Sequence, residues 1–434
     1  MESRNQFGSL DYFKLIAAFL VAAIHTSPLT SFSSGADFVF TRVLARMAVT
    51  FFLMVTGFFL LPQYIFEYTK DCRPLKRFMK KTLLLYMVAL FLYLPVNLYA
   101  GQLKGLGVDG ILRLLLFDGT FYHLWYLPAS ILGVLLITVM SRYFSFRIIA
   151  GFSLLLYGLG LLGDSYYGFI TDIPLLRSFF DVIFRITSYT RNGLLYAPLF
   201  LIMGAWIQHF PRPQENLKHW ISLAISVIAM VGEGLLLHHL EVQRHDSMYI
   251  LLPVCMYFLF LQLRSIKTAP VKYLRTLSTW IYLIHPWMIV LIRGAARHLC
   301  LENLLVNNSL GHYIAVCIAA FLSAWAFTKI SSAIRRKPFL TDRAWIELDR
   351  ANLEHNIQAL KKLLPPGCQF MPAVKANAYG HGAVLISKEL NRLGIKAFCV
   401  AAVTEGIELR RNGIKGDILI LGYTHPEQFP LLRK

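Results

Sequence analysis

The sequence predicts an α-helical, polytopic membrane bundle of about ten transmembrane helices, followed by the first part of an incomplete α/β barrel of the (β/α)8 type. Three observations predict this fold class. Of the 434 residues, 56% are hydrophobic and only 15% are charged, whereas soluble domains carry roughly 25% charged residues. The mean hydropathy is +0.54. Near residue 340, long apolar runs give way to short strands that alternate with amphipathic helices.

Each predicted span is a run of about 20 mostly apolar residues, which is the length that crosses the hydrocarbon core of a bilayer. The lipid bilayer is therefore the first predicted partner, and residues 1–336 are predicted to form the membrane domain. The first run lacks a small-residue cleavage site, so we expect it to remain as a helix. The runs centre near residues 10–28, 43–61, 80–100, 124–141, 146–163, 193–210, 219–237, 248–264, 278–294 and 311–333.

The positive charge gathers in short clusters between apolar runs, at residues 70–81, 264–275 and 335–337. With ten spans and an internal N-terminus, all three clusters fall on one face, which the positive-inside rule places in the cytoplasm. We therefore expect the N-terminus and the C-terminal segment to be cytoplasmic. The net charge of +19 follows this membrane pattern, so no nucleic-acid partner is expected.

The second predicted domain covers residues 341–434. Strands are predicted over 344–348, 370–374, 397–402 and 417–421, and helices over 351–364, 382–393 and 404–412. This alternation is typical of parallel βαβ units. A complete eight-fold barrel needs roughly 250 residues, so we expect the segment to be a piece of a longer domain. The six cysteines show no spacing typical of a zinc site, and no metal is expected.

The most informative motif is Ala373-Val374-Lys375-Ala376-Asn377-Ala378-Tyr379-Gly380-His381-Gly382. A lysine at the C-terminal end of a parallel barrel strand points toward the face where such folds carry out their chemistry. A desolvated lysine can condense with a carbonyl cofactor, and the helix that begins next offers an N-terminus for a phosphate. The alternative is a strand-end lysine that extends to water and is followed by an ordinary turn.

Residues 343–422 resemble the alanine racemase family, through Ala344-Trp345-Ile346-Glu347-Leu348-Asp349, the motif around Lys375, and Ile418-Leu419-Ile420-Leu421-Gly422. The resemblance implies that Lys375 carries pyridoxal 5′-phosphate and serves as one of two catalytic bases, while Tyr379 contacts the cofactor phosphate. It also implies a homodimer, because the family's second base is a tyrosine that the C-terminal domain of the partner subunit supplies. The sequence contains no counterpart of that domain, so we expect this chain not to racemise an amino acid unaided.

The first predicted span contains Lys14 and His25 within an apolar run. Eleven helical residues bring them back to within roughly 20° of the same face, about 16 Å apart along the axis. Ala18 and Ala22 lie between them, so this stripe fits a narrow polar passage. The alternative fits the stripe equally well: Lys14 and His25 reach water at the two ends of the helix, and the alanines pack against other helices.

The Lys14-x10-His25 pair resembles the signature of the acyltransferase-3 family of membrane proteins. Supporting segments are Phe51-Phe52-Leu53-Met54-Val55-Thr56-Gly57-Phe58, His123-Leu124-Trp125-Tyr126-Leu127 and Tyr282-Leu283-Ile284-His285-Pro286. The resemblance covers about residues 5–335 and implies that His25 is the histidine of acyl transfer, with Lys14 in the place of the motif's arginine.

The predicted topology places His25, His123, Arg191 and Glu233 near the outer ends of their helices. Such a cluster is able to bind a zwitterion or to activate a hydroxyl group. Each residue taken alone fits a side chain at the water interface.

Together the two segments resemble the membrane-bound serine racemases of vancomycin-resistance systems. This resemblance implies a bacterial cell-membrane enzyme that converts L-serine to D-serine, with alanine as the other candidate amino acid. The D-serine would enter peptidoglycan precursors that bind vancomycin weakly. Three roles stay open for the membrane domain, which would take up L-serine, acylate a cell-envelope substrate or only anchor the enzyme.

Overall fold

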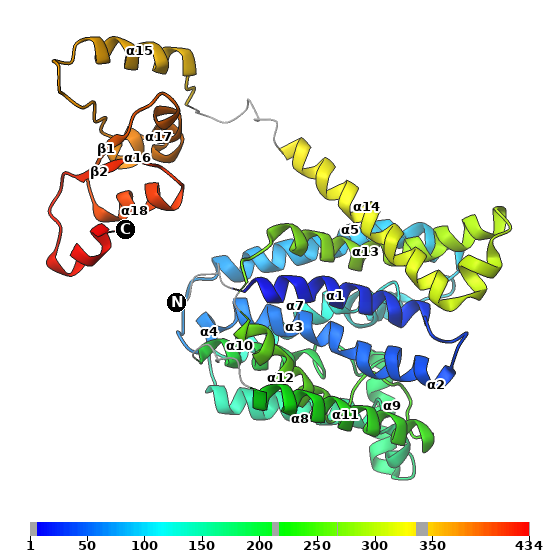
Figure 1. Ribbon diagram of the computed structural model, residues 1–434. Coiled ribbons are helices and arrows are strands. Elements are labelled where there is room, and N and C mark those ends of the chain that lie inside the picture. Colours follow the sequence, from blue (N-terminus) through cyan, green and yellow to red (C-terminus); the bar gives the residue numbers. More distant parts are fainter. Residues whose placement is uncertain (1–6, 211–216, 267, 336–345, 434) are drawn as a thin grey trace. The chain divides into compact units, whose positions relative to one another are not determined.

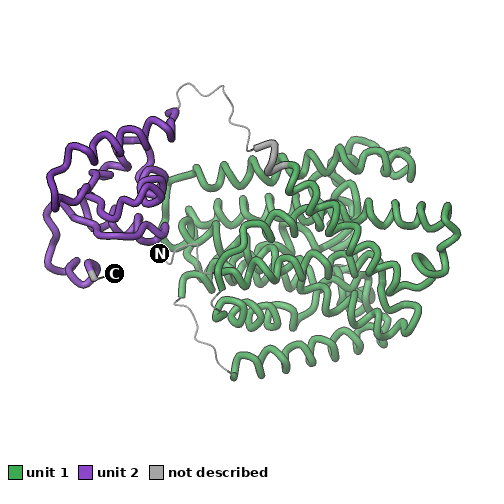
Figure 2. Tube along the Cα trace, turned by 45° about the horizontal axis from the view of Figure 1, so that its top comes forward, with its two compact units in different colours: residues 1–336 green, residues 337–434 purple. Residues whose placement is uncertain are grey.

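The computed structural model describes residues 7–210, 217–266, 268–335 and 346–433. The chain divides into two compact units, Met1–Arg336 and Lys337–Lys434, which Figure 2 draws in green and purple. Unit 1 is helical, whereas unit 2 combines helices with a parallel pair of strands. Each unit has a hydrophobic core of its own.

Unit 1 is built from α-helices, many of which run side by side (Figure 1). They are α1 Gly8–Thr26, α2 Ser34–Asp37, α3 Met47–Leu60, α4 Pro62–Ile65, α5 Arg73–Tyr99, α6 Val108–Arg113, α7 Tyr126–Met140, α8 Phe146–Leu162, α9 Pro174–Ile186, α10 Ala197–His209, α11 Leu217–His239, α12 Leu252–Ser265, α13 Lys272–His298 and α14 Ser309–Arg335. The π-helical segment η2 Phe38–Val43 and the 3₁₀ segment η3 Leu44–Arg46 lead from α2 into α3. Helices satisfy their own backbone groups, which is what an apolar solvent requires.

The described residues contain a helix at each of the ten predicted spans. By length and composition, six helical stretches in the described part are able to cross a membrane: α1, the stretch Ser34–Leu60, α5, α11, α13 and α14. Helices α7, α8 and α12 are apolar but shorter, and α10 has 13 residues. A membrane bundle is thereby supported. The number of ten membrane spans and the orientation of the chain in the membrane stay predictions.

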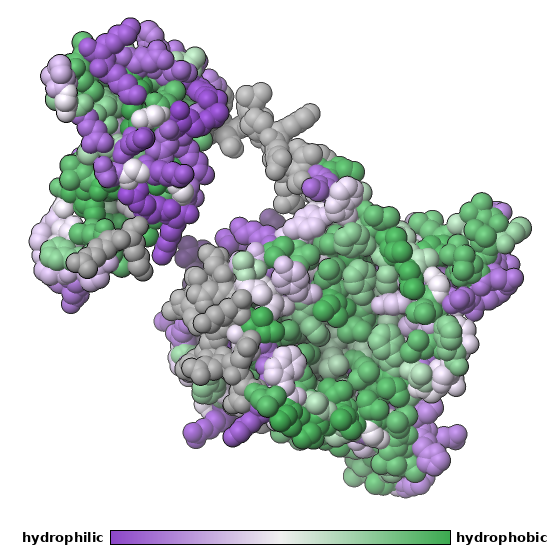
Figure 3. Space-filling model, viewed as in Figure 1, coloured by the Kyte–Doolittle hydropathy of each residue, from purple (hydrophilic) through white to green (hydrophobic). Residues whose placement is uncertain are grey.

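Apolar side chains cover a broad face of unit 1, seen in green in Figure 3. On α5 and α11, Leu84, Phe91, Ile225 and Ile228 are each more than half exposed. Soluble monomers rarely expose apolar patches larger than a few hundred Å². We therefore interpret this face as the surface that contacts lipid.

Helices α3 and α10 approach each other closely because each contributes a glycine. A Cβ atom added to Gly57 would lie 1.9 Å from the carbonyl oxygen of Leu201, and one added to Gly204 would lie 2.0 Å from that of Met54. Small residues let membrane helices approach until their backbones touch. This pair lies within the largest buried cluster of unit 1, which includes Met54 and Leu201.

Unit 2 consists of α15 Arg350–Lys362, α16 Lys375–Tyr379, α17 Ala383–Arg392, β1 Ala397–Val400, α18 Val403–Arg411, β2 Asp417–Ile420 and η7 Pro426–Arg433. Strands β1 and β2 are parallel, with Ala397 opposite Asp417 and Val400 opposite Ile420. Because α18 joins them, β1–α18–β2 is a parallel βαβ unit of the kind that the sequence pattern predicts.

Two predicted strands of unit 2 differ in the structure. The segment 370–374 contributes a single parallel bridge, between Ala373 and Cys399 of β1. Of the strand predicted over 344–348, residues 344 and 345 lie outside the described residues. Residues 346–348 form no regular structure, and Ile346 and Leu348 are exposed because no described strand pairs with them. The incomplete barrel therefore stays a prediction beyond the βαβ unit.

Candidate functional site

Lys375 lies directly after the segment that pairs with β1. The amide of Val374 donates to the carbonyl of Cys399 at 2.8 Å, and the amide of Cys399 donates to the carbonyl of Pro372 at 2.9 Å. Val374 is buried, whereas Lys375 is partly exposed. The lysine thus directly follows the residues that pair with β1.

The four residues that follow Lys375 form a left-handed turn. Their φ angles are 50° at Ala376, 56° at Asn377, 51° at Ala378 and 54° at Tyr379. Such angles cost an ordinary L-residue roughly 1–2 kcal/mol each. Backbone strain of this kind persists only where the surroundings hold it, and it gathers at functional sites. The turn is therefore a feature that the rest of unit 2 must hold in place.

Two side chains hold this turn. Glu405, in the first turn of α18, accepts the amide of Ala376 at 2.9 Å through Oε1 and the amide of Ala401 at 2.7 Å through Oε2. Asn377 Oδ1 accepts the amide of Ala383, the first residue of α17, at 2.9 Å. The turn is thereby fixed to the end of β1 and to the start of α17. Asn377 thereby occupies one of the amides at the N-terminus of α17, and the phosphate site there stays a prediction.

We expect Glu405→Gln to loosen this turn. Glutamine keeps one carbonyl oxygen where glutamate has two, so one of the two backbone amides loses its acceptor. Hydrogen exchange followed by mass spectrometry should show about tenfold faster exchange in the peptide that contains Ala376, since a hydrogen bond to a partly exposed charged group is worth about 1.5 kcal/mol. Glu408→Gln, an exposed change on the same helix, is the matched control. Equal exchange in both variants would show that Glu405 does not hold the turn.

The residues around Lys375 fit pyridoxal phosphate. No described side chain or carbonyl forms a hydrogen bond or ion pair with the Lys375 amine or the Tyr379 hydroxyl, so both are available, and Tyr379 is exposed. A cavity of about 240 Å³ adjoins the turn. Its lining residues are Val374, Asn377, Ala383, Val400, Glu405, Glu408 and Leu409. These observations allow a cofactor held covalently by Lys375 with Tyr379 beside it.

In unit 1, the structure brings His25 and His123 to a third histidine, His285 of α13. The His25 and His285 rings are stacked with their centroids 5.5 Å apart, and the His123 ring meets His285 edge-on at 5.2 Å. Tyr122 lies 4.3 Å from the His25 ring. His123 and His285 are buried. We call His25, His123 and His285 the histidine cluster.

The local backbone explains why His285 is held in place. Pro286 has no N–H, so it cannot donate to the carbonyl of Tyr282 four residues earlier. The Nδ1 atom of His285 lies 2.8 Å from that oxygen and takes the place of the missing donor. The hydroxyl of Tyr282 in turn donates to the backbone carbonyl of His123. His285 was not among the site residues predicted from the sequence, where the His-Pro pair only supported a resemblance.

Lys14 does not lie in the histidine cluster. Its amine is 3.4 Å from Asp11, whose carboxylate also pairs with Arg275 at 2.8 Å. Ala18 is fully buried in a cluster that α1 shares with α13 and α14. The small residues between Lys14 and His25 therefore favour helix packing over the polar passage.

Arg191 and Glu233 form their hydrogen bonds with residues outside the histidine cluster. Arg191 donates to Ser247 Oγ at 3.0 Å, and its guanidinium lies 4.4 Å from the Tyr189 ring. Glu233 accepts the Tyr166 hydroxyl at 2.6 Å and two backbone amides just before α12. Glu233 is thus occupied by structural contacts, and no described hydrogen bond or ion pair joins either residue to the histidine cluster.

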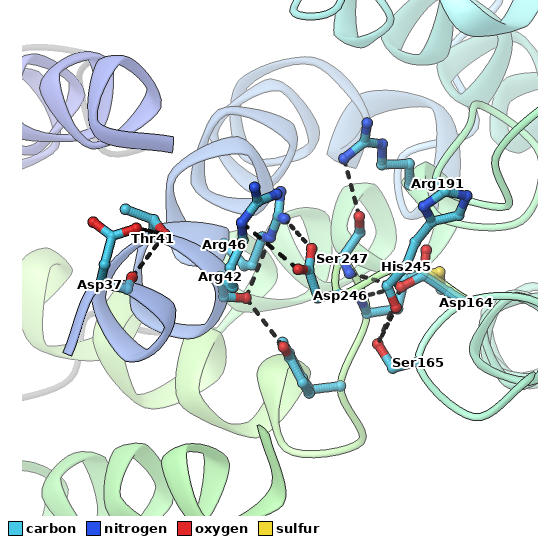
Figure 4. A network of polar contacts seen from close by, with 12 residues as sticks. Asp37, Thr41, Arg42, Arg46, Asp164, Ser165, Arg191, His245, Asp246 and Ser247 are labelled. Carbon is cyan, nitrogen blue, oxygen red and sulfur yellow. Dashed lines mark hydrogen bonds and ion pairs between the residues drawn. The ribbon is translucent and has the colours of Figure 1, made fainter. Parts of the chain in front are cut away.

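Arg191 belongs to a polar network that sequence reasoning missed (Figure 4). Asp246 pairs with Arg46 and lies 3.7 Å from Arg42, while Asp164 accepts the amide of Ser247 at 2.6 Å. The network fixes the loop between α11 and α12 to η3. Its charges are distributed over distant loops, so no local sequence pattern predicts their contact.

The comparisons with known proteins match both units. Residues 7–329 match the family model of the acyltransferase domain, which is more than half of the chain. The chain belongs to the acyltransferase-3 family. Residues 348–434 match the model of the alanine racemase N-terminal domain, so this family member joins the two domains, and both resemblances drawn from the sequence are confirmed.

Curated relatives match almost the whole chain. An amino-acid racemase from Enterococcus faecalis is 41% identical over 99% of this chain and 60% of its own length. A serine/alanine racemase from Enterococcus gallinarum is 35% identical over 98% of this chain and 61% of its own length. An alanine racemase from Nostoc sp. is 50% identical over 91 residues, which are 21% of this chain and 24% of that protein. The chain thus spans about three fifths of the length of the two enterococcal relatives.

Proposed function

We propose that the intact protein is a membrane-bound amino-acid racemase, an isomerase that uses pyridoxal 5′-phosphate. The observation that carries the proposal is the Lys375 amine, which is unpaired among the described residues and precedes a turn held by Glu405, within a segment that matches the alanine racemase N-terminal domain. The names of the enterococcal relatives support the same activity. The proposed substrates are serine and alanine.

Lys375 would hold the cofactor covalently, and Tyr379 would contact the cofactor phosphate. When bound, pyridoxal phosphate withdraws electrons from the amino acid and makes the α-proton acidic. The Lys375 amine is then the group of this chain that moves that proton on one face of the substrate. The second base is proposed to come from a partner subunit, so the enzyme would work as a homodimer.

The proposed location is the bacterial cell membrane, with the N-terminus and unit 2 in the cytoplasm. Three basic clusters favour this orientation under the positive-inside rule. D-serine produced there would be available for peptidoglycan precursors, and vancomycin resistance is the biological role that follows. Unit 1 would supply L-serine to the racemase.

The test is to trap the cofactor. Purified intact protein is incubated with pyridoxal phosphate, reduced with borohydride, digested and analysed by mass spectrometry. We expect the pyridoxyl mass on the peptide that contains Lys375, and chiral chromatography should show racemisation of L-serine or L-alanine by the same preparation. A label confined to other lysines, or no label, would refute the proposal.

A second candidate function for unit 1 is acyl transfer to a hydroxyl group of the cell envelope. The match of residues 7–329 to the acyltransferase domain favours it, together with the position of His25 in the histidine cluster. Incorporation of labelled acetyl groups into envelope material, lost in His25→Ala, would support this function.

A further inference from the structure

The Nε2 atom of His285 is a buried hydrogen-bond acceptor. The carbonyl oxygen of Tyr282 can only accept, so the Nδ1 atom that lies 2.8 Å from it must carry the proton. In the neutral imidazole this leaves a lone pair on Nε2. Nε2 is buried and has no hydrogen-bond partner among the described residues. A buried acceptor without a hydrogen-bond donor costs roughly 1–3 kcal/mol of stability. We therefore expect a donor group beside this atom.

The neighbours of His285 favour one kind of donor. His123 is buried beside His285, and a neutral imidazole offers one donor and one acceptor. No group of three or more His, Cys, Asp or Glu residues in the described ranges is arranged to hold a metal ion. A carboxylate oxygen facing Nε2 would be repelled by the lone pair. A hydroxyl group both donates and accepts, so it complements His285 and His123 together.

We propose that the histidine cluster binds a hydroxyl group of the substrate of unit 1, and that His285 Nε2 accepts the hydrogen bond from it. Where unit 1 supplies an amino acid, which rests on the proposed function, the hydroxyl distinguishes serine from alanine. Where unit 1 transfers an acyl group, the hydroxyl is that of the acyl acceptor. Both sources share one chemistry, and His285 is the residue that selects for it.

The experiment compares His285→Asn with His285→Gln in the intact protein, in nanodiscs. Asparagine places an amide near Nδ1 and keeps the donor to Tyr282 but lacks the Nε2 acceptor. Glutamine places its amide oxygen near Nε2. His312→Asn is the matched control. His312 is also buried, and its Nδ1 lies 2.8 Å from a backbone carbonyl. Its Nε2 has no hydrogen-bond partner among the described residues, and no described ring contact joins it to the cluster histidines.

Two arms identify the source of the hydroxyl. The first measures binding of labelled L-serine, in competition with unlabelled L-serine or L-alanine, in a Lys375→Arg background, so that the proposed racemase site is disabled. We expect about tenfold weaker serine binding in His285→Asn, partial recovery in His285→Gln, no change in His312→Asn, and poor competition by alanine. The second measures transfer of labelled acetyl from acetyl-CoA to a hydroxyl acceptor in membrane vesicles, which forms an ester and releases free CoA.

Loss of serine binding in His285→Asn assigns the hydroxyl to the amino acid, and loss of ester formation alone assigns it to an acyl acceptor. Wild-type behaviour of His285→Asn in both arms overturns the proposal. In the serine arm, equal competition by alanine and serine when His285 is unchanged excludes the amino acid as the source of the hydroxyl, and that measurement needs no variant of His285 to fold. Trapping of the cofactor on Lys375 tests the racemase proposal separately. The hydroxyl proposal and the racemase proposal can therefore fail independently.

Discussion

Lys375→Arg should abolish pyridoxyl labelling and lower racemisation by about 10²–10⁴-fold, the range for losing a group that transfers a proton in the transition state. Arginine keeps the positive charge, but its guanidinium stays protonated and does not condense with an aldehyde in the way that a lysine amine does. Because Lys375 makes no hydrogen bond or ion pair with another described residue, the substitution leaves unit 2 without a lost contact. The loss would therefore report chemistry and not folding.

Lys388→Arg is the matched control, because Lys388 is exposed on α17 of the same unit. Labelling and racemisation should be unchanged in this variant. Racemisation by chiral chromatography and labelling by mass spectrometry are measured on the same samples. Persistent activity in Lys375→Arg would assign the cofactor to another group and would remove the basis of the racemase proposal.

The second large effect is expected at the contact between α3 and α10. Gly204→Val would place a Cβ atom 2.0 Å from the carbonyl oxygen of Met54, so the two backbones would have to separate. Overpacking of a close contact costs about 3 kcal/mol or more, and here both partners are backbone that cannot turn aside. We expect most of the protein to be lost as aggregate during heating in detergent.

Gly158→Val on α8 is the control for the low helix propensity of valine. No atom lies within 4 Å of a Cβ added at Gly158, so this variant introduces valine without a steric clash. The fraction of protein that elutes as a single species after heating is compared for the two variants. If both eluted like the unmodified protein, the close contact between α3 and α10 would not exist in the membrane.

The positions of the helices in unit 1 could be predicted because lipid requires long apolar runs with satisfied backbones. The partners of the charged residues in unit 1 could not be predicted from the sequence. Glu233 was expected beside His25, yet it binds Tyr166 and two backbone amides. Residues on different helices meet through crossing geometry, which hydropathy does not encode. His285 was within reach of sequence reasoning, since Pro286 frees the carbonyl of Tyr282 in any helix.

In unit 2, strands β1 and β2 could be predicted, because each lies in a short, mostly apolar run between turn residues. The left-handed turn after Lys375 could not, because Ala376, Asn377, Ala378 and Tyr379 include no glycine that signals positive φ. Its brace, Glu405, lies 29 residues beyond Ala376. Only the tertiary structure shows that the two meet.

The 29 residues that separate Ala376 from Glu405 in the sequence have a consequence for synthesis on the ribosome. When Lys375 leaves the exit tunnel, the glutamate that binds the following amide has not yet emerged, and the nascent chain has nothing to hold Ala376 in its left-handed conformation. The lysine therefore acquires its final setting only after α18 has been translated, so a coenzyme bound as proposed would be captured late, on a nearly finished βαβ unit.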